Sequence, residues 1–115
     1  MNRASFVKRI PYIQKCIVRS PGSELTGVLC SLSVAGAYVG MEPIPNVGDI
    51  VSVEFLLPGN DVAVVVDAQF IWRNAMRKSP IHSLPVGGGA RFFGLGVNER
   101  RRLEEAIRSY TPPIR

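Results

Sequence analysis

Apolar and polar residues alternate along most of the chain before residue 97, which is the period of β-strands with one buried face. The longest such stretch spans residues 62–73. Its apolar side chains at alternate positions are expected to share one face: Val62, Val64, Val66, Ala68, Phe70 and Trp72. Shorter runs of the same kind predict five more strands, at residues 12–19, 25–33, 37–41, 49–57 and 90–97.

The spacing of apolar residues changes near the C-terminus and predicts one helix. Asn98 is a favourable N-cap and Glu99 falls in the first turn, where a negative charge is stabilising. Apolar residues then recur at the helical period, at Leu103, Ala106, Ile107 and Tyr110. Prolines 112 and 113 end the pattern, so we expect a helix over residues 98–110.

Turn and loop signals separate these elements. The largest break is the polar, basic stretch 74–88, where two prolines and the start of a triple glycine, residues 87–89, predict irregular structure. Six short strands followed by one amphipathic helix indicate a fold dominated by β-structure, an antiparallel barrel closed by the helix. We expect a flexible basic arm over residues 1–11, the barrel with its helix over 12–110, and a tail over 111–115.

The size and hydropathy of the chain indicate one cytoplasmic domain. Its 115 residues are 46% hydrophobic, which suffices for a single core. No apolar run approaches the roughly 20 residues of a membrane-spanning helix, and residues 1–11 lack the apolar core of a secretion signal. We therefore expect no membrane insertion.

Charge is distributed unevenly along the sequence. Residues 1–19 contain five basic and no acidic side chains, residues 20–72 six acidic and no basic ones, and residues 73–115 nine basic and three acidic ones. The 11 arginines and three lysines suit bidentate recognition of phosphate. The pattern favours an anionic partner where the two ends of the chain meet, or serves solubility alone.

Few residues are suited to catalysis or metal binding. His82 is the only histidine, and Cys16 and Cys30 fall in strand-like runs typical of buried apolar cysteines. Ser31 and Ser33 have no evident histidine and aspartate partners, and the triple glycine precedes a strand, whereas a phosphate loop opens a helix. We expect a binding protein without enzymatic activity, metal or resident cofactor.

Five short motifs, in order, resemble the PilZ domain family. That family combines an RxxxR element, a (D/N)xSxxG turn and a GD-initiated strand that ends in Leu-Pro. The corresponding segments here are 8–12, 31–39 and 48–58, followed by 68–73 and 88–95. The resemblance covers nearly the whole chain and implies a six-stranded barrel with a C-terminal helix that binds cyclic diguanylate, a bacterial second messenger with two phosphates and two guanines.

The resemblance also implies ligand-binding residues. Arg9 matches the second arginine of RxxxR, Ser33 the serine of the turn and Gly36 its glycine. The alternative is that Arg9 is a solvated charge before a strand and that Ser33 and Gly36 only shape a turn. An arginine can clamp a phosphate or stack on a purine, and a glycine allows the ligand to approach the backbone closely.

Two positions depart from the family pattern. Ser5 stands in place of the first arginine, and Ser31 in place of the Asp or Asn that pairs with a guanine edge. Each lost contact, worth about 1–3 kcal/mol, weakens affinity roughly 5- to 150-fold. Arg3 or Lys8 are candidates to compensate by placing a cation near a phosphate.

Three functions remain open at this point. The first is a cyclic diguanylate receptor with weakened affinity that relays the signal to a partner protein in motility or surface behaviour. The second is a degenerate adaptor that acts only through protein contacts. The third, a barrel that binds DNA or RNA, fits the pI near 9.8 but lacks interleaved surface aromatics, so we expect no nucleic acid partner. Trp72 is interpreted as a partly buried cap on the core, with a stacking platform as the alternative. Arg100–Arg102 is interpreted as an exposed helix face, with contact to an acidic partner as the alternative.

Overall fold

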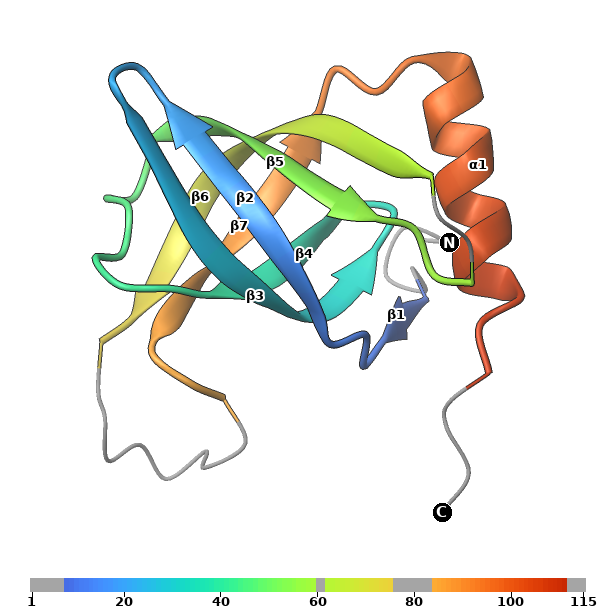
Figure 1. Cartoon of the computed structure of the whole chain (residues 1–115), viewed down its shortest axis with the longest axis horizontal. Coiled ribbons are helices and arrows are strands. Elements are labelled where there is room, and N and C mark those ends of the chain that lie inside the picture. Colours follow the sequence, from blue (N-terminus) through green and yellow to red (C-terminus); the bar gives the residue numbers. More distant parts are fainter. Residues whose placement is uncertain (1–7, 60–61, 76–83, 112–115) are drawn as a thin grey trace, which may run out of the picture.

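A closed antiparallel barrel with one helix across its end forms the body of the molecule (Figure 1). The computed structural model describes residues 8–59, 62–75 and 84–111. The barrel strands are β2 (Gln14–Ser20), β3 (Ser23–Ser33), β4 (Gly36–Gly40), β5 (Ile50–Leu56), β6 (Ala63–Asn74) and β7 (Gly87–Phe93). They pair in the order β3-β2-β5-β6-β7-β4, and β4 closes the barrel by pairing with β3. A two-residue strand, β1 (Arg9–Ile10), pairs with β3, and α1 spans Val97–Arg108.

The core fills the barrel as the alternating pattern predicts. Val51, Val53 and Phe55 of β5 point inward and are buried, while intervening residues are partly or fully exposed. The helix α1 buries Leu103 and Ile107 against this core, and Tyr110 packs edge-to-face on Tyr12 with ring centroids 6.0 Å apart. The predicted six-stranded barrel with a C-terminal helix is confirmed.

Two predicted boundaries are wrong. The helix begins two residues earlier than the Asn98 cap implies, because Gly96 is the N-cap and its N–H donates to Glu99 Oε1 at 2.9 Å. The predicted loop 74–88 is wrong at both ends: β6 extends to Asn74, and β7 starts at Gly87 and ends at Phe93. The triple glycine thus forms the start of β7. At these three positions the neighbouring strands and side chains come so close that a Cβ would collide with them.

The predicted orientation of Trp72 is also wrong. Phe70 pairs with Ala90, but Trp72 pairs with Gly89, so Ile71 is an extra residue in β6. Such a bulge breaks the period of two. Phe70 remains in the core, whereas both Ile71 and Trp72 are exposed on the outside of the barrel.

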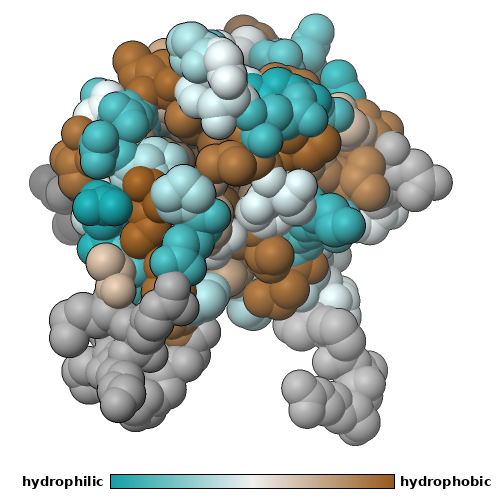
Figure 2. Space-filling model, turned by 60° about the vertical axis from the view of Figure 1, so that its left-hand side comes forward, coloured by the Kyte–Doolittle hydropathy of each residue, from teal (hydrophilic) through white to brown (hydrophobic). Residues whose placement is uncertain are grey.

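The outer surface is chemically mixed. Figure 2 shows hydrophobic and hydrophilic residues interspersed over one face of the molecule, and exposed apolar side chains include Ile50 and Val65 on neighbouring strands. Cys16 is buried, Cys30 is partly buried, and both are free thiols. Within the three described ranges, no helix has the length and apolar character needed to cross a bilayer.

Candidate ligand-binding site

One row of residues crosses four strands on the outside of the barrel. Ser31 of β3 pairs with Tyr38 of β4, Tyr38 with Gly89 of β7, and Gly89 with Trp72 of β6. Paired residues on neighbouring strands project from the same face, so these side chains lie side by side. Register shifts directly before Ser31 and before Trp72 bring the two ends of the row into this alignment.

Arg9 completes the row from β1. Its backbone pairs with Ser33, and its Nη1 donates a hydrogen bond to Ser31 Oγ at 2.9 Å. Together with the row, Arg9 borders a pocket of about 430 Å³, a size typical of small-molecule sites. The pocket is lined by Arg9, Ser31, Ala37, Tyr38, Ile71, Trp72, Leu84, Gly89 and Ala90. Arg9 is the one charged side chain among these described residues.

An aromatic pair forms one wall of this pocket. The rings of Tyr38 and Trp72 lie with centroids 5.3 Å apart and planes tilted by 36°. The Tyr38 hydroxyl donates to the Pro85 carbonyl and accepts from Asn74 Nδ2 at 3.2 Å. Burial raises the pKa of Tyr38 and outweighs the lowering effect of the Asn74 hydrogen bond, so the phenol stays neutral at physiological pH. A Cβ at Gly89 would collide with the indole of Trp72, so glycine is required beneath this ring.

Ser33 and Gly36 form the turn between β3 and β4 and do not line the pocket. Ser33 is only 1% exposed, and its Oγ accepts the N–H groups of Ala35 and Gly36 at 3.1 and 3.2 Å. Gly36 packs so closely on β7 that a Cβ would collide with the carbonyl of Ala90. Both residues shape the loop beside the pocket, and their direct contact with ligand stays a prediction.

Lys8 lies away from Arg9. It lines a separate pocket of about 410 Å³ with Val34 and the α1 residues Arg100, Glu104, Ile107 and Arg108. Arg3 and Ser5 fall outside the described residues. The structure therefore brings Arg9 and Ser31 together and places Lys8 elsewhere.

Sequence reasoning missed Tyr38 as a pocket residue, and for Trp72 it favoured a partly buried core cap over a stacking platform. The available signal was the triple glycine near a single tryptophan, because glycine inside a strand indicates close approach of another group. Trp72 pairs with Gly89 only because of the bulge in β6, and no local sequence pattern predicts that bulge.

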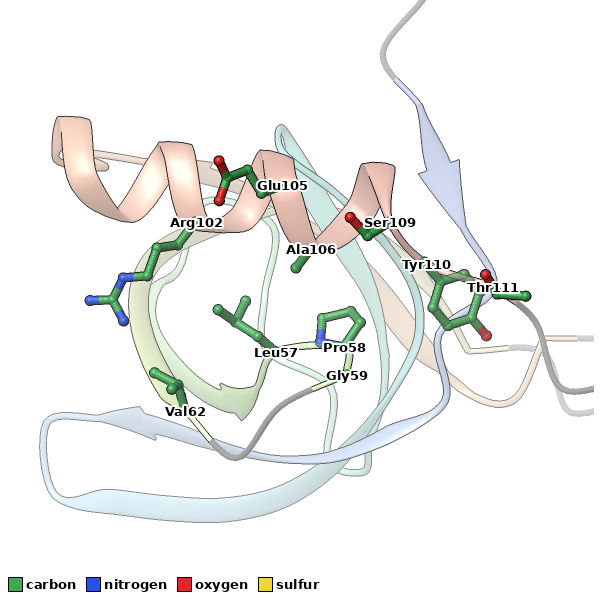
Figure 3. Close-up of a pocket in the computed structure, with 10 residues that line it drawn as sticks. All are labelled: Leu57, Pro58, Gly59, Val62, Arg102, Glu105, Ala106, Ser109, Tyr110 and Thr111. Atoms are coloured by element: carbon green, nitrogen blue, oxygen red, sulfur yellow. The ribbon is translucent and has the colours of Figure 1, made fainter.

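Another pocket, of about 600 Å³, lies between α1 and the turn that follows β5 (Figure 3). Leu57 and Val62 line it from the turn, and Arg102, Ala106 and Tyr110 from the C-terminal segment. None of the predicted ligand-binding residues that the structure describes lines it. Across the described ranges, no three His, Cys, Asp or Glu side chains are grouped closely enough to hold a metal ion.

The sequence profile of the PilZ domain family matches residues 2–109. The chain belongs to the PilZ domain family. This confirms the resemblance seen in the motifs. In this PilZ domain the motif residues divide into two groups: Arg9 and Ser31 face the pocket, while Ser33 and Gly36 form the adjoining turn.

Solved structures show the same fold at low sequence identity. The inhibitor of motility MotI (DgrA) of Bacillus subtilis superimposes with a TM-score of 0.69 at 13% identity, over 94% of this chain and 51% of that one. This PilZ domain thus spans about half of MotI.

Two further neighbours match over most of both chains. The PilZ domain of Escherichia coli YcgR, solved with c-di-GMP, gives a TM-score of 0.69 at 20% identity over 90% of this chain and 88% of that one. The PilZ domain of CeSA from a cellulose-synthesizing bacterium gives 0.56 at 21%, over 87% and 90%. No curated protein matches the sequence.

Proposed function

We propose that this PilZ domain is a receptor module that binds cyclic diguanylate in the pocket bordered by Arg9, Ser31 and the Tyr38–Trp72 pair. The observation that carries the proposal is the position of Arg9, a motif arginine that lies at a pocket with an aromatic wall and no acidic side chain among its described lining. The fold it shares with YcgR, which was solved with c-di-GMP, supports the same ligand.

The chemistry of Arg9 suits a phosphate of this ligand. Its guanidinium has five N–H donors in a planar fork, and among the described residues it makes one side-chain hydrogen bond, to Ser31. A phosphate oxygen can take the remaining donors in bidentate fashion. A neutral wall of Tyr38 and Trp72 adds apolar contact area without repelling the anion.

The same geometry suggests how the signal reaches a partner protein. The pocket is bordered by β1 on one side and by β4, β6 and β7 on the other. A ligand in it joins the N-terminal strand to the barrel and stabilises that arrangement by its binding energy. The partner, which we place in a motility or surface-behaviour system, would recognise the surface around β1. MotI, the motility inhibitor with the same fold, supports this class of output.

A second candidate is an adaptor that binds no nucleotide and acts through protein contacts alone. Two observations favour it: the Ser33 hydroxyl is buried in the turn, and Lys8 lines a different pocket from Arg9. Among the described pocket residues, Arg9 is then the single positive charge available to a ligand that has two phosphates.

Calorimetric titration of the wild type and two variants with cyclic diguanylate decides between these candidates. Arg9→Ala should weaken binding at least about tenfold, because a charged bidentate contact is lost. Arg91→Ala, which removes an exposed arginine of β7 that does not line the pocket, is the matched control and should bind as the wild type does. Absence of heat with a folded wild type at millimolar nucleotide would establish the adaptor, whereas equal binding by Arg9→Ala would place the ligand elsewhere.

A further inference from the structure

Trp72 has an unusual position for the largest apolar side chain of the protein. It is 44% exposed, although a strand with unbroken alternation would bury it in line with Phe70. The bulge at Ile71 turns the indole outward, and the absence of a side chain at Gly89 makes room for it. Bulges that re-aim a side chain are common beside functional sites.

Neighbouring groups hold the indole in place. Tyr38, itself 4% exposed and fixed by hydrogen bonds to Pro85 and Asn74, packs against one side of the ring. The rest of the indole lines the pocket that Arg9 also borders. A fixed, half-exposed indole and a guanidinium that line one pocket provide two planar groups on which an aromatic ligand can stack.

The pocket offers little to recognise the edge of a base. Guanine presents two N–H donors on its Watson–Crick edge and needs acceptors there. The side-chain oxygens in the described lining are Ser31 Oγ, which accepts from Arg9, and the Tyr38 hydroxyl, which is bonded to Pro85 and Asn74. The lining contains no carboxylate and no amide side chain among these residues.

We propose that Arg9 and Trp72 clamp a purine ring of the ligand between them, so that the site recognises the face of the base and discriminates weakly between guanine and adenine. This inference rests on the proposed binding of a cyclic dinucleotide. Stacking tolerates any base because every base has a π-face, whereas discrimination depends on hydrogen bonds to its edge.

The wild-type protein carries its own probe. Trp72 is the single tryptophan of the chain, so the protein's indole emission reports on this residue alone. Titration with cyclic diguanylate and with cyclic di-adenylate should quench that emission saturably. The two dissociation constants should lie within about fivefold of each other, below the discrimination expected from even one bidentate base contact.

Calorimetry on variants tests the contact without fluorescence. Trp72→Leu should weaken binding of both nucleotides by about 5- to 150-fold, the range of one lost base–aromatic stack. Trp72→Phe should retain most of the affinity, because an aromatic face remains. Phe93→Leu removes a comparably exposed aromatic residue outside the pocket and should bind as the wild type does.

The possible failures are distinguishable. If neither nucleotide produces heat, the proposed function and this inference both fall. If calorimetry shows binding but the nucleotide leaves the wild-type emission unchanged and Trp72→Leu binds as tightly as the wild type, the clamp alone is overturned. If Trp72 is required for binding but cyclic diguanylate binds more than about tenfold more tightly than cyclic di-adenylate, the site forms hydrogen bonds to the edge of the base. The proposed weak discrimination is then wrong.

Discussion

Two serines of β3, Ser31 and Ser33, occupy motif positions but have different surroundings. Ser31 is partly exposed and accepts a hydrogen bond from Arg9, whereas Ser33 is buried and bonded to the backbone of its own turn. Their sequence context predicted a ligand contact for both. The distinction depends on the path of residues 34–36, which folds back over Ser33, and on the position of β1 across from it.

Cys16 allows a prediction at the same scale. It is buried between β3 and β5, and this burial raises the pKa of its thiol from 9.0 to about 11. Between these values the unfolded thiol ionises while the folded one stays neutral. The contribution of this thiol to the free energy of unfolding is therefore fully present below pH 9. It falls by about 2 kcal/mol as the pH rises to 11.

Urea denaturation from pH 7 to 11 under reducing conditions measures this loss. Cys16→Ala should be less stable than the wild type at pH 7, because a small cavity remains. Its free energy of unfolding should then decline less steeply above pH 9. Equal slopes for the two proteins would show that the Cys16 thiol does not titrate differently in the folded and unfolded states.

At the scale of elements, the barrel strands could be predicted because each carries an alternating pattern that one buried face requires. The start of β7 could not, since glycine in isolation indicates a loop and these three glycines are ordered only by their neighbours. The bulge at Ile71 could not be predicted either, because the alternation of apolar and polar residues in the sequence continues through Trp72. Both features arise from pairing between strands, and both determine the pocket.

Substitution of neighbouring glycines in β7 tests their separate roles. Gly89→Ala would drive a Cβ into the indole of Trp72 on the outside, and Gly88→Ala would drive one against the backbone carbonyl of Trp72 and the ring of Phe70, away from the indole. Each should destabilise the protein by about 1–3 kcal/mol, the usual cost of overpacking. Only Gly89→Ala should shift the emission maximum of Trp72 in the folded state. Shifts of equal size in both variants would mean that the indole does not rest on Gly89.

At the scale of the whole molecule, the fold brings the described parts of the two basic terminal segments, residues 8–19 and 84–111, into contact. The Tyr110 hydroxyl donates to the carbonyl of Pro11 at 3.4 Å, and Lys8 shares a pocket with Arg100 and Arg108 of α1. Acidic residues of the middle segment are partly neutralised, since Arg19 contacts Glu24 and Glu54 at 2.9 and 2.7 Å. The charge asymmetry of the sequence thus places Lys8 and two arginines of α1 around one pocket, which also contains Glu104.

This asymmetry predicts a strong effect of salt on ligand association. The Debye length is about 30 Å at 0.01 M salt, comparable to the 36 × 35 × 32 Å extents of the protein, and about 3 Å at 1 M. The net charge of +5 should therefore attract a dianionic nucleotide across the whole molecule only at low salt. We expect the association rate constant for fluorescently labelled cyclic diguanylate, measured by stopped-flow anisotropy, to fall at least about tenfold between these concentrations.

A charge variant separates this long-range attraction from direct contact. Arg101 and Arg102 are exposed on α1 and do not line the Arg9 pocket. Arg101→Gln combined with Arg102→Gln should slow association at 0.01 M salt and match the wild type at 1 M. The dissociation rate should stay constant, because neither side chain contacts the ligand. A faster dissociation in this variant would instead place the nucleotide against α1 and away from the row that ends at Trp72.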